Sequence, residues 1–124
     1  MDSVTGLLLE FDSSTGSLLR SIGIEHSGYS KTSYSGEIYI DEDDNIYLTG
    51  EVEDVSRDAI LTKLKITKTD VKALWSLVWG GDGTDSAKAA ISGSPYTYLT
   101  GITYSTSRSG KLIKPILFSL NELA

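Results

Sequence analysis

One short segment of the chain, with the sequence D-E-D-D-N, is strongly acidic and is the first candidate for chemistry. Asp41, Asp43 and Asn45 have the spacing with which calcium-binding loops present oxygen ligands to a hard cation. A complete EF-hand loop would place Gly sixth and Glu twelfth, but Ile46 and Val52 stand there. Short polar side chains also favour tight turns for backbone reasons. We therefore expect a hairpin turn without a metal, and calcium is the one cofactor that the pattern allows.

Two other features invite a catalytic or ligand-binding interpretation. His26 is the single histidine and lies beside Glu25 in a stretch rich in Ser, Thr and Gly. Nucleophilic catalysis by serine needs an oriented base, and nothing in the sequence marks a serine as the nucleophile. We interpret His26 as a solvated loop histidine. The segment Gly80 to Gly83 resembles an anion-binding nest, but it lacks the lysine of a phosphate-binding loop, so we expect a connecting loop and predict no catalytic residue.

Aromatic side chains are the third candidate, as a surface for sugars or peptides. At strand positions they more often fill packing positions between strands and sheets, and we expect this of Trp75, Trp79, Tyr39, Tyr47, Tyr96, Tyr98 and Tyr104. Tyr29 and Tyr34 lie instead in the long polar loop. Together with His26, they form the predicted exposed interaction surface.

Composition narrows the classes of partner. The formal net charge is −6 and the basic residues are scattered, which argues against binding to nucleic acid or to anionic membranes. The absence of Cys excludes disulfides and thiolate metal sites. We expect no signal peptide or transmembrane segment in this chain, and the sequence does not identify a compartment. Gln is absent and Asn and Met are scarce, as in some thermostable proteins.

Period-two alternation and turn residues predict an all-β chain, and the candidate residues lie on its strands and connections. We expect a single β-repeat domain that begins with a hairpin at 7–22 and a loop at 23–35. The first unit covers 36–80, with strands at 37–41, 45–53, 58–66 and 71–79. The second unit covers 86–121, with strands at 87–92, 96–104 and 114–120. Polar loops at 25–35, 54–58 and 105–112 are the segments expected to face a partner.

The chain repeats itself. The tetrapeptide Tyr-Leu-Thr-Gly ends at Gly50 and again at Gly101, 51 residues later. Phe11 in the opening hairpin matches Leu64, 53 residues later, and Ser21 matches Ser76, 55 residues later. A period of this length is typical of propellers and solenoids, in which each unit buries its apolar face against a neighbour. We call the four strands of the first unit a to d in chain order. By alignment with them, the opening hairpin corresponds to c-d and the second unit to a-b-c, so the expected order along the chain is c-d, a-b-c-d, a-b-c.

A resemblance to a known family follows from these residues. The pattern of Tyr-Leu-Thr-Gly in strand b, Leu74-Trp75-Ser76 in strand d and a closing Gly80-Gly81 resembles the SBBP-type β-propeller repeat. It covers about residues 36–121, with a half repeat at 7–22. The second unit departs from it, with Gly93-Ser94-Pro95 in place of the acidic turn and no second Trp-Ser strand. The resemblance implies four-stranded antiparallel blades, about two per chain, and a binding or scaffolding role, with no catalytic residues to transfer.

A propeller needs four or more blades, so about two blades per chain leave three alternatives. The chain is part of a longer propeller, or several copies assemble head to tail into a homo-oligomeric ring, or it forms an open sheet pair. The functional hypothesis is a non-enzymatic module that binds a protein or a glycan. The alternative is a fragment of a propeller-fold hydrolase or lyase whose active site is not contained here.

Overall fold

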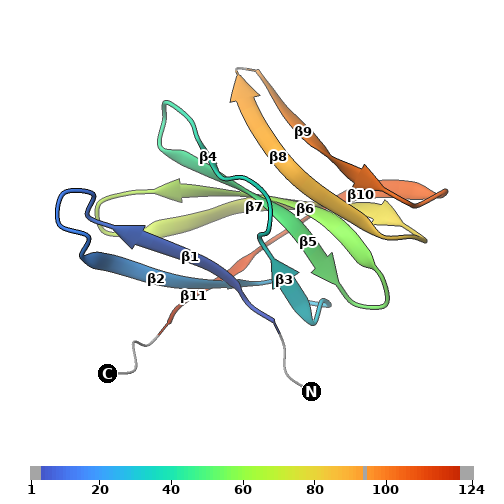
Figure 1. Cartoon of the computed structure of the whole chain (residues 1–124), viewed down its shortest axis with the longest axis horizontal. Helices are drawn as coiled ribbons and strands as arrows, with labels where there is room; N and C mark the ends of the chain where they lie inside the picture. The colour runs from blue at the N-terminus through green and yellow to red at the C-terminus, as the bar shows by residue number, and fades with distance from the viewer. Residues whose placement is uncertain (1–3, 94, 121–124) are drawn as a thin grey trace.

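A computed structural model describes residues 4–93 and 95–120 of the 124-residue chain. These residues form eleven β strands and no helix, which confirms the all-β prediction (Figure 1). The strands are β1 (Gly6–Phe11), β2 (Leu18–Glu25), β3 (Lys31–Ser33), β4 (Tyr39–Ile40), β5 (Asn45–Glu53), β6 (Arg57–Ile66), β7 (Val71–Gly81), β8 (Asp85–Gly93), β9 (Tyr96–Thr103), β10 (Arg108–Ile113) and β11 (Ile116–Ser119).

The strands form three antiparallel sheets that stack as layers. The first sheet has the order β1-β2-β11, and the central six-stranded sheet has the order β10-β7-β6-β5-β3, with β4 also paired to β5. The third is the hairpin β8-β9. The first sheet packs on one face of the central sheet and β8 crosses the opposite face, over β5 and β6 (Figure 1).

Alternation along β5 explains why the central sheet is covered on both faces. Ile46 and Leu48 point to the first sheet, where they join a buried cluster with Leu8, Ile22, Ile24 and Leu64. Tyr47 points the other way, and its hydroxyl oxygen lies 3.1 Å from Oγ of Ser92 in the hairpin. Because successive side chains of a strand face opposite sides, one nine-residue segment contributes to both interfaces.

The glycine of the repeated tetrapeptide has the same role at both positions. A Cβ atom on Gly50 would collide with the carbonyl oxygen of Ser33, and one on Gly101 would collide with the carbonyl oxygen of Ser86. In each case a backbone segment passes directly against the glycine, where only a residue without a side chain fits. The close approach explains why Gly follows Tyr-Leu-Thr at both sites.

The predicted strand 114–120 needs correction. Residues 116–119 do form β11, but β11 pairs with β2 of the first sheet and not with β9. Residues 108–112 of the loop expected at 105–112 belong instead to β10, on the edge of the central sheet beside β7. The segment Arg108 to Lys111 is polar and contains Gly110, so it lacks the apolar alternation from which strands are predicted. An exposed edge strand needs little such alternation. Within the residues described, no helix is long and apolar enough to span a bilayer.

Candidate functional site

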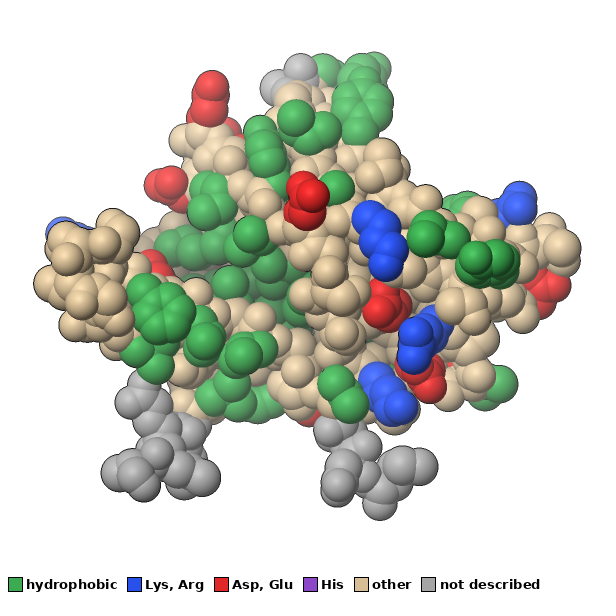
Figure 2. Space-filling view, viewed as in Figure 1, with side chains coloured by type: hydrophobic (Ala, Val, Ile, Leu, Met, Phe, Trp, Pro, Cys, Tyr) green, Lys and Arg blue, Asp and Glu red, His purple; other side chains and the backbone are tan. Residues whose placement is uncertain are grey.

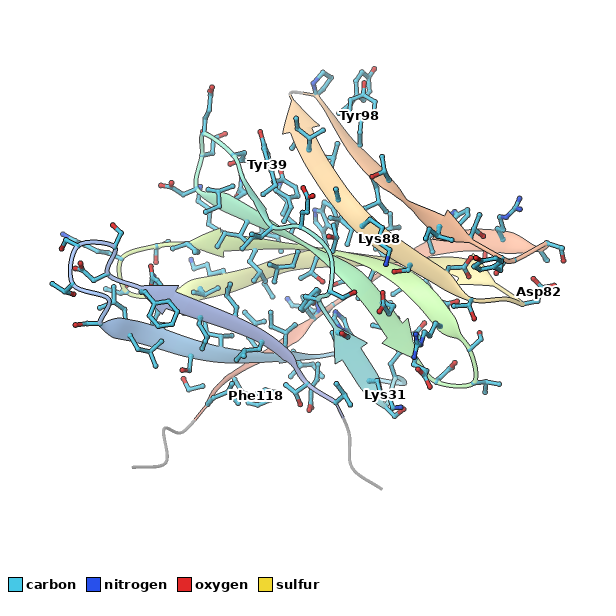
Figure 3. All side chains as sticks on the ribbon, viewed as in Figure 1. Lys31, Tyr39, Asp82, Lys88, Tyr98 and Phe118 are labelled. Atoms are coloured by element: carbon cyan, nitrogen blue, oxygen red, sulfur yellow. The ribbon has the colours of Figure 1, made fainter. Side chains whose placement is uncertain are left out.

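Polar loops from three parts of the chain converge at one end of the molecule. The backbone N–H of Ser30 donates to the carbonyl of Glu53 at 3.0 Å, which joins the loop after β2 to the β5–β6 turn. At the tip of the β7–β8 connection, Asp82 accepts hydrogen bonds from the backbone N–H of Thr106 at 2.8 Å and from its hydroxyl at 2.7 Å (Figure 3). The loops predicted at 25–35, 54–58 and 105–112 therefore lie next to one another.

A buried carboxylate holds this end together. Asp85, at the start of β8, is fully buried and accepts hydrogen bonds from the hydroxyls of Thr103 and Ser105 and from the N–H of Gly81. Burial acts to raise the pKa of Asp85, but these hydrogen bonds lower it below its ordinary value. Thr106 and Ser107 likewise lower the pKa of Asp82 to about 2. Both carboxylates stay ionised and fix the loops.

A polar groove of about 360 Å³ opens between these loops, and Tyr29, Asp54, Asp58 and Lys111 are among the residues that line it. Burial raises the pKa of Asp58, and the neighbouring carboxylates of Asp85 and Asp54 raise it further. One carboxylate oxygen of Asp58 is buried without a hydrogen-bond partner. That oxygen is enclosed beside Gly80, so a ligand does not reach it; what the groove itself presents are the lining carboxyl groups of Asp54 and Asp58. The sequence analysis missed Asp58, because a lone carboxylate at the start of a strand carries no motif.

His26 is buried, so the prediction of a solvated loop histidine is wrong. The exposed fraction of the residue is 2%, because β3 folds the predicted loop back along β5. Its Nδ1 lies 3.1 Å from Oγ1 of Thr32 and its Nε2 lies 2.7 Å from Oγ of Ser76. Burial lowers the pKa of His26 to about 4. The imidazole is thus a neutral part of the interior and does not belong to an interaction surface.

The same polar network also draws in Tyr34, which was predicted to be exposed. Its hydroxyl lies 2.6 Å from Oγ1 of Thr62, and Thr62 lies 2.7 Å from Oγ of Ser76. Its ring packs against both buried apolar clusters, and burial raises its pKa well above the ordinary value. Of the three residues predicted as an interaction surface, only Tyr29 reaches the groove, where it is half-buried.

The acidic turn between β4 and β5 is held by its own hydrogen bonds. Asp41 accepts from the N–H of Asp43 at 2.9 Å, from the N–H and the side-chain amide of Asn45 at 3.0 and 2.9 Å, and from the hydroxyl of Tyr47 at 3.1 Å. Burial acts to raise the pKa of Asp41, but these bonds lower it to about 2. Asp44 adopts the left-handed conformation, with φ of 62°. Asp41, Asp43 and Asn45 thus act as turn residues, and no metal-binding group of three or more acidic, His or Cys residues occurs in the described ranges.

The strand aromatics divide into two groups. Tyr39 and Tyr47 pack with ring centroids 5.9 Å apart, and the ammonium group of Lys63 lies 5.4 Å from the centre of the Tyr47 ring, as expected for packing residues. The three tyrosines of the hairpin and the segment after it are 62% to 75% exposed: Tyr96, Tyr98 and Tyr104. For these three the expectation of packing is wrong within a single chain.

Apolar side chains are also uncovered on the outer layers. Figure 2 shows them gathered at the tip of the hairpin and along the first sheet. Figure 3 places Tyr98 and Phe118 at opposite outer sides of the molecule. The chain therefore carries two kinds of accessible surface, namely the polar loop end and the apolar outer layers.

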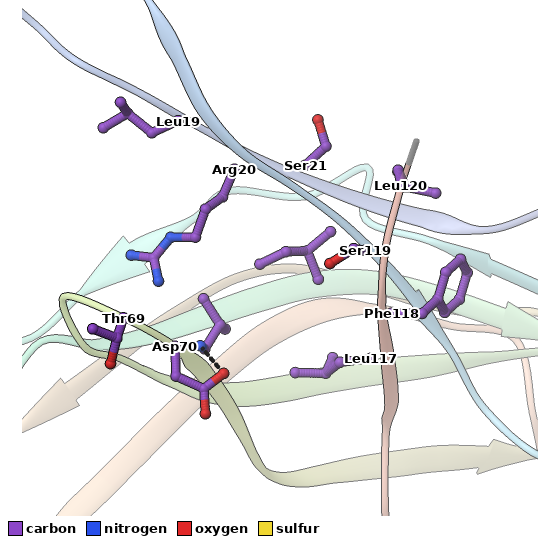
Figure 4. A pocket seen from close by; sticks show the side chains of 11 residues that line it. Leu19, Arg20, Ser21, Thr69, Asp70, Leu117, Phe118, Ser119 and Leu120 are labelled. Carbon is purple, nitrogen blue, oxygen red and sulfur yellow. Dashed lines mark hydrogen bonds between the residues drawn. The ribbon is translucent and has the colours of Figure 1, made fainter. Parts of the chain in front are cut away.

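A further groove, of about 460 Å³, lies between the first sheet and the β6–β7 turn (Figure 4). Arg20 lines it and forms a two-point ion pair with Glu10, at 2.5 and 3.1 Å. Asp70 lines it as well, and its carboxylate accepts from the N–H of Val71 at 2.8 Å (Figure 4). Glu10 pairs with Nε and Nη2 of Arg20, whereas Nη1 of the same guanidinium is buried without a hydrogen-bond partner. Comparisons with protein-family models, with curated proteins and with solved structures gave no match.

Proposed function

We propose that the chain is a non-enzymatic binding or scaffolding module of the β-propeller type. The observation that carries the proposal is the face-to-face stacking of three antiparallel sheets, whose middle member contains the order β4-β5-β6-β7 (Figure 1). Propeller blades are four-stranded antiparallel sheets of this order that pack against the next blade through their faces. In this proposal the first sheet and the hairpin belong to the two neighbouring blades.

The loop end is the surface that we assign to ligand binding. In a rigid β scaffold the connections carry recognition, and here Asp82 and Asp85 fix two of them in place, between β7 and β8 and between β9 and β10. The groove beside them is lined by the carboxyl groups of Asp54 and Asp58 and by the ring of Tyr29. A carboxylate beside an aromatic ring suits a sugar hydroxyl or a protein amino group. The partner class is therefore a glycan or a protein.

The chemistry of the interior supports binding over catalysis. His26 is enclosed and its ring nitrogens are hydrogen-bonded to Thr32 and Ser76, so it has no access to a substrate. A general base must reach the proton that it abstracts. At the loop end Asp82 and Asp85 are ionised and committed to structural hydrogen bonds, which leaves the groove-lining carboxyl groups of Asp54 and Asp58 for contact with a ligand.

Native gel electrophoresis through gels that contain individual polysaccharides tests the proposal. We expect at least one polysaccharide to retard the protein, with retardation weakened in Tyr29→Ala and unchanged in the control Tyr96→Ala. Tyr96 is an exposed tyrosine at the hairpin tip, far from the loops. The same mixtures are assayed for new reducing ends and for unsaturated sugar products. Release of either product by the wild-type protein would overturn the proposal in favour of a hydrolase or lyase.

A further inference from the structure

The outer face of the first sheet is apolar and uncovered. Side chains on this face are between 38% and 57% exposed although all are large and apolar: Leu7, Leu9, Phe11, Leu19, Ile116 and Phe118. They alternate with buried residues such as Leu8 and Ile22, which face the central sheet. A contiguous apolar sheet face of this kind marks an interaction site in a soluble protein.

The hairpin β8-β9, on the other side of the central sheet, also has an unpaired strand edge. Among residues 4–93 and 95–120, β9 pairs only with β8, and its other edge is free along eight residues without a charged side chain. An exposed, uncharged edge strand is a template for pairing with another strand. β1, in turn, is the terminal strand of the first sheet. In the described residues β1 therefore offers a free edge from Gly6 onward, since only Val4 before it is bridged to Lys31, and β9 offers a second free edge.

The central sheet shows how such edges join. There β4 and β5 form a pair that continues directly into β6 and β7, and β10 extends the far side. The hairpin β8-β9 corresponds to the first pair, because Tyr-Leu-Thr-Gly recurs in β5 and β9. The first sheet corresponds to the second pair with its extension, because Phe11 matches Leu64 and β11 follows β2 as β10 follows β7. The two ends are complementary halves of one unit.

We infer that β9 of one copy of this chain pairs antiparallel with β1 of a second copy, which completes an antiparallel sheet of the order β8-β9-β1-β2-β11 with strands from both copies. In the central sheet Leu48 lies opposite Thr62 and Gly50 lies opposite Ile60. Transferred through the repeat spacings, this register places Leu99 opposite Leu9 of the second copy and Gly101 opposite its Leu7. All six residues of β1 then fall opposite residues 97–102 of β9.

The register also covers the exposed faces. Leu99 points to the central sheet and lines an apolar groove of about 330 Å³ with Leu77 and Trp79. Leu9 of the second copy, as its cross-strand neighbour, lies on the same face and so continues over β7 and β10, where Leu112 is 68% exposed. The apolar outer face of the first sheet is thereby buried against the uncovered part of the partner's central sheet.

The number of copies rests on the proposed propeller type. Each copy contributes one complete four-stranded unit and two halves, which amounts to two blades. Propellers close with about four to eight blades, so the ring contains about two to four copies. Because the contact is head to tail, it closes only as a ring, in which every β9 edge is paired with a β1 edge.

Light scattering after size-exclusion chromatography tests the assembly. We expect one discrete species of two to four times 13.4 kDa at micromolar concentrations. Leu9→Lys places a charge in the new interface but at an exposed position of the single chain, so it gives a monomer with an unchanged far-ultraviolet circular dichroism spectrum. The control Val55→Lys, at a 98% exposed position in the β5–β6 turn, stays assembled. A monomeric wild-type protein, or an assembled Leu9→Lys variant, overturns the inference.

Crosslinking tests the register, because the chain has no cysteine of its own. A mixture of Leu9→Cys and Leu99→Cys proteins is expected to form a covalent heterodimer with a short thiol crosslinker. The matched mixture of Leu9→Cys and Tyr98→Cys is expected to form none, because Tyr98 points to the opposite face of β9. Equal crosslinking in both mixtures refutes the register. A monomer that still binds polysaccharide refutes the assembly alone, whereas an assembled protein that releases sugar products refutes only the proposed function.

Discussion

The stability of the fold below neutral pH should depend on His26. The residue is 2% exposed, and burial lowers its pKa from 6.5 to about 4. In the unfolded chain the imidazole takes up a proton near its ordinary pKa, whereas the folded protein does so only near the lowered value. Between the two values the unfolded state therefore binds more protons, and the free energy of unfolding falls as the pH falls.

The magnitude follows from the size of the shift. One pKa unit corresponds to about 1.4 kcal/mol, so the shift of His26 from 6.5 to about 4 represents at most about 3 kcal/mol. At pH 5 only part of this is lost, and we expect unfolding to cost about 1.5 kcal/mol less than at pH 6.5. Most carboxylates in this interval remain ionised in both states, so the histidine dominates the slope.

Equilibrium urea unfolding, followed by the fluorescence of Trp75 and Trp79, measures this slope. The titration is run in small pH steps at one fixed protein concentration, because assembly would otherwise shift the midpoint. The matched control is His26→Gln, whose amide can hydrogen-bond to Thr32 and Ser76 but does not titrate. We expect a sloped profile for the wild type and a nearly flat one for the variant between pH 6.5 and 5. Parallel profiles would refute the assignment of the slope to His26.

Three further outcomes are expected from the structure. In urea unfolding, Gly50→Ala should lower the free energy of unfolding by at least about 2 kcal/mol, because its Cβ would strike the backbone of Ser33. The control Gly93→Ala should change it by less than about 0.5 kcal/mol, because a Cβ at Gly93 meets no atom within 4 Å. Asp85→Ala should cost about 2 to 4 kcal/mol, because it leaves three hydrogen-bond donors at the loop end without their acceptor; a cost near zero would contradict its role there. Calcium should leave the thermal midpoint unchanged, because Asp41 is already committed to the turn, and a rise in the midpoint would contradict this account.

Local patterns in the sequence predicted most strands well. The strand expected at 45–53 has the observed bounds, and those expected at 58–66 and 71–79 differ from β6 and β7 by at most two residues at either end. These segments alternate apolar and polar residues and end at turn residues, and both signals act over a few residues. The acidic turn was also predicted correctly as a hairpin connection.

The errors concern residues whose surroundings come from distant parts of the chain. His26 was expected in solvent because its neighbours are polar, but β3 and β7 supply Thr32 and Ser76 to enclose it. Tyr34 was expected to be exposed for the same reason, and it packs instead against two apolar clusters. A polar stretch can be buried where hydroxyl groups satisfy one another, and nothing in its composition reveals this.

The sequence by itself determined that the chain is all-β, where most of its strands lie and that one segment is repeated. Alternation and turn residues act over a few positions, and a repeat is visible when two segments of the sequence are compared. The tertiary structure decided which strands pair, since pairing depends on which edges are free once the layers have stacked. Residues 108–113 pair with β7 and residues 116–119 pair with β2, so β9 lacks the partner strand that the sequence had suggested. The free edges at the two ends, and the buried state of His26, follow from that long-range arrangement.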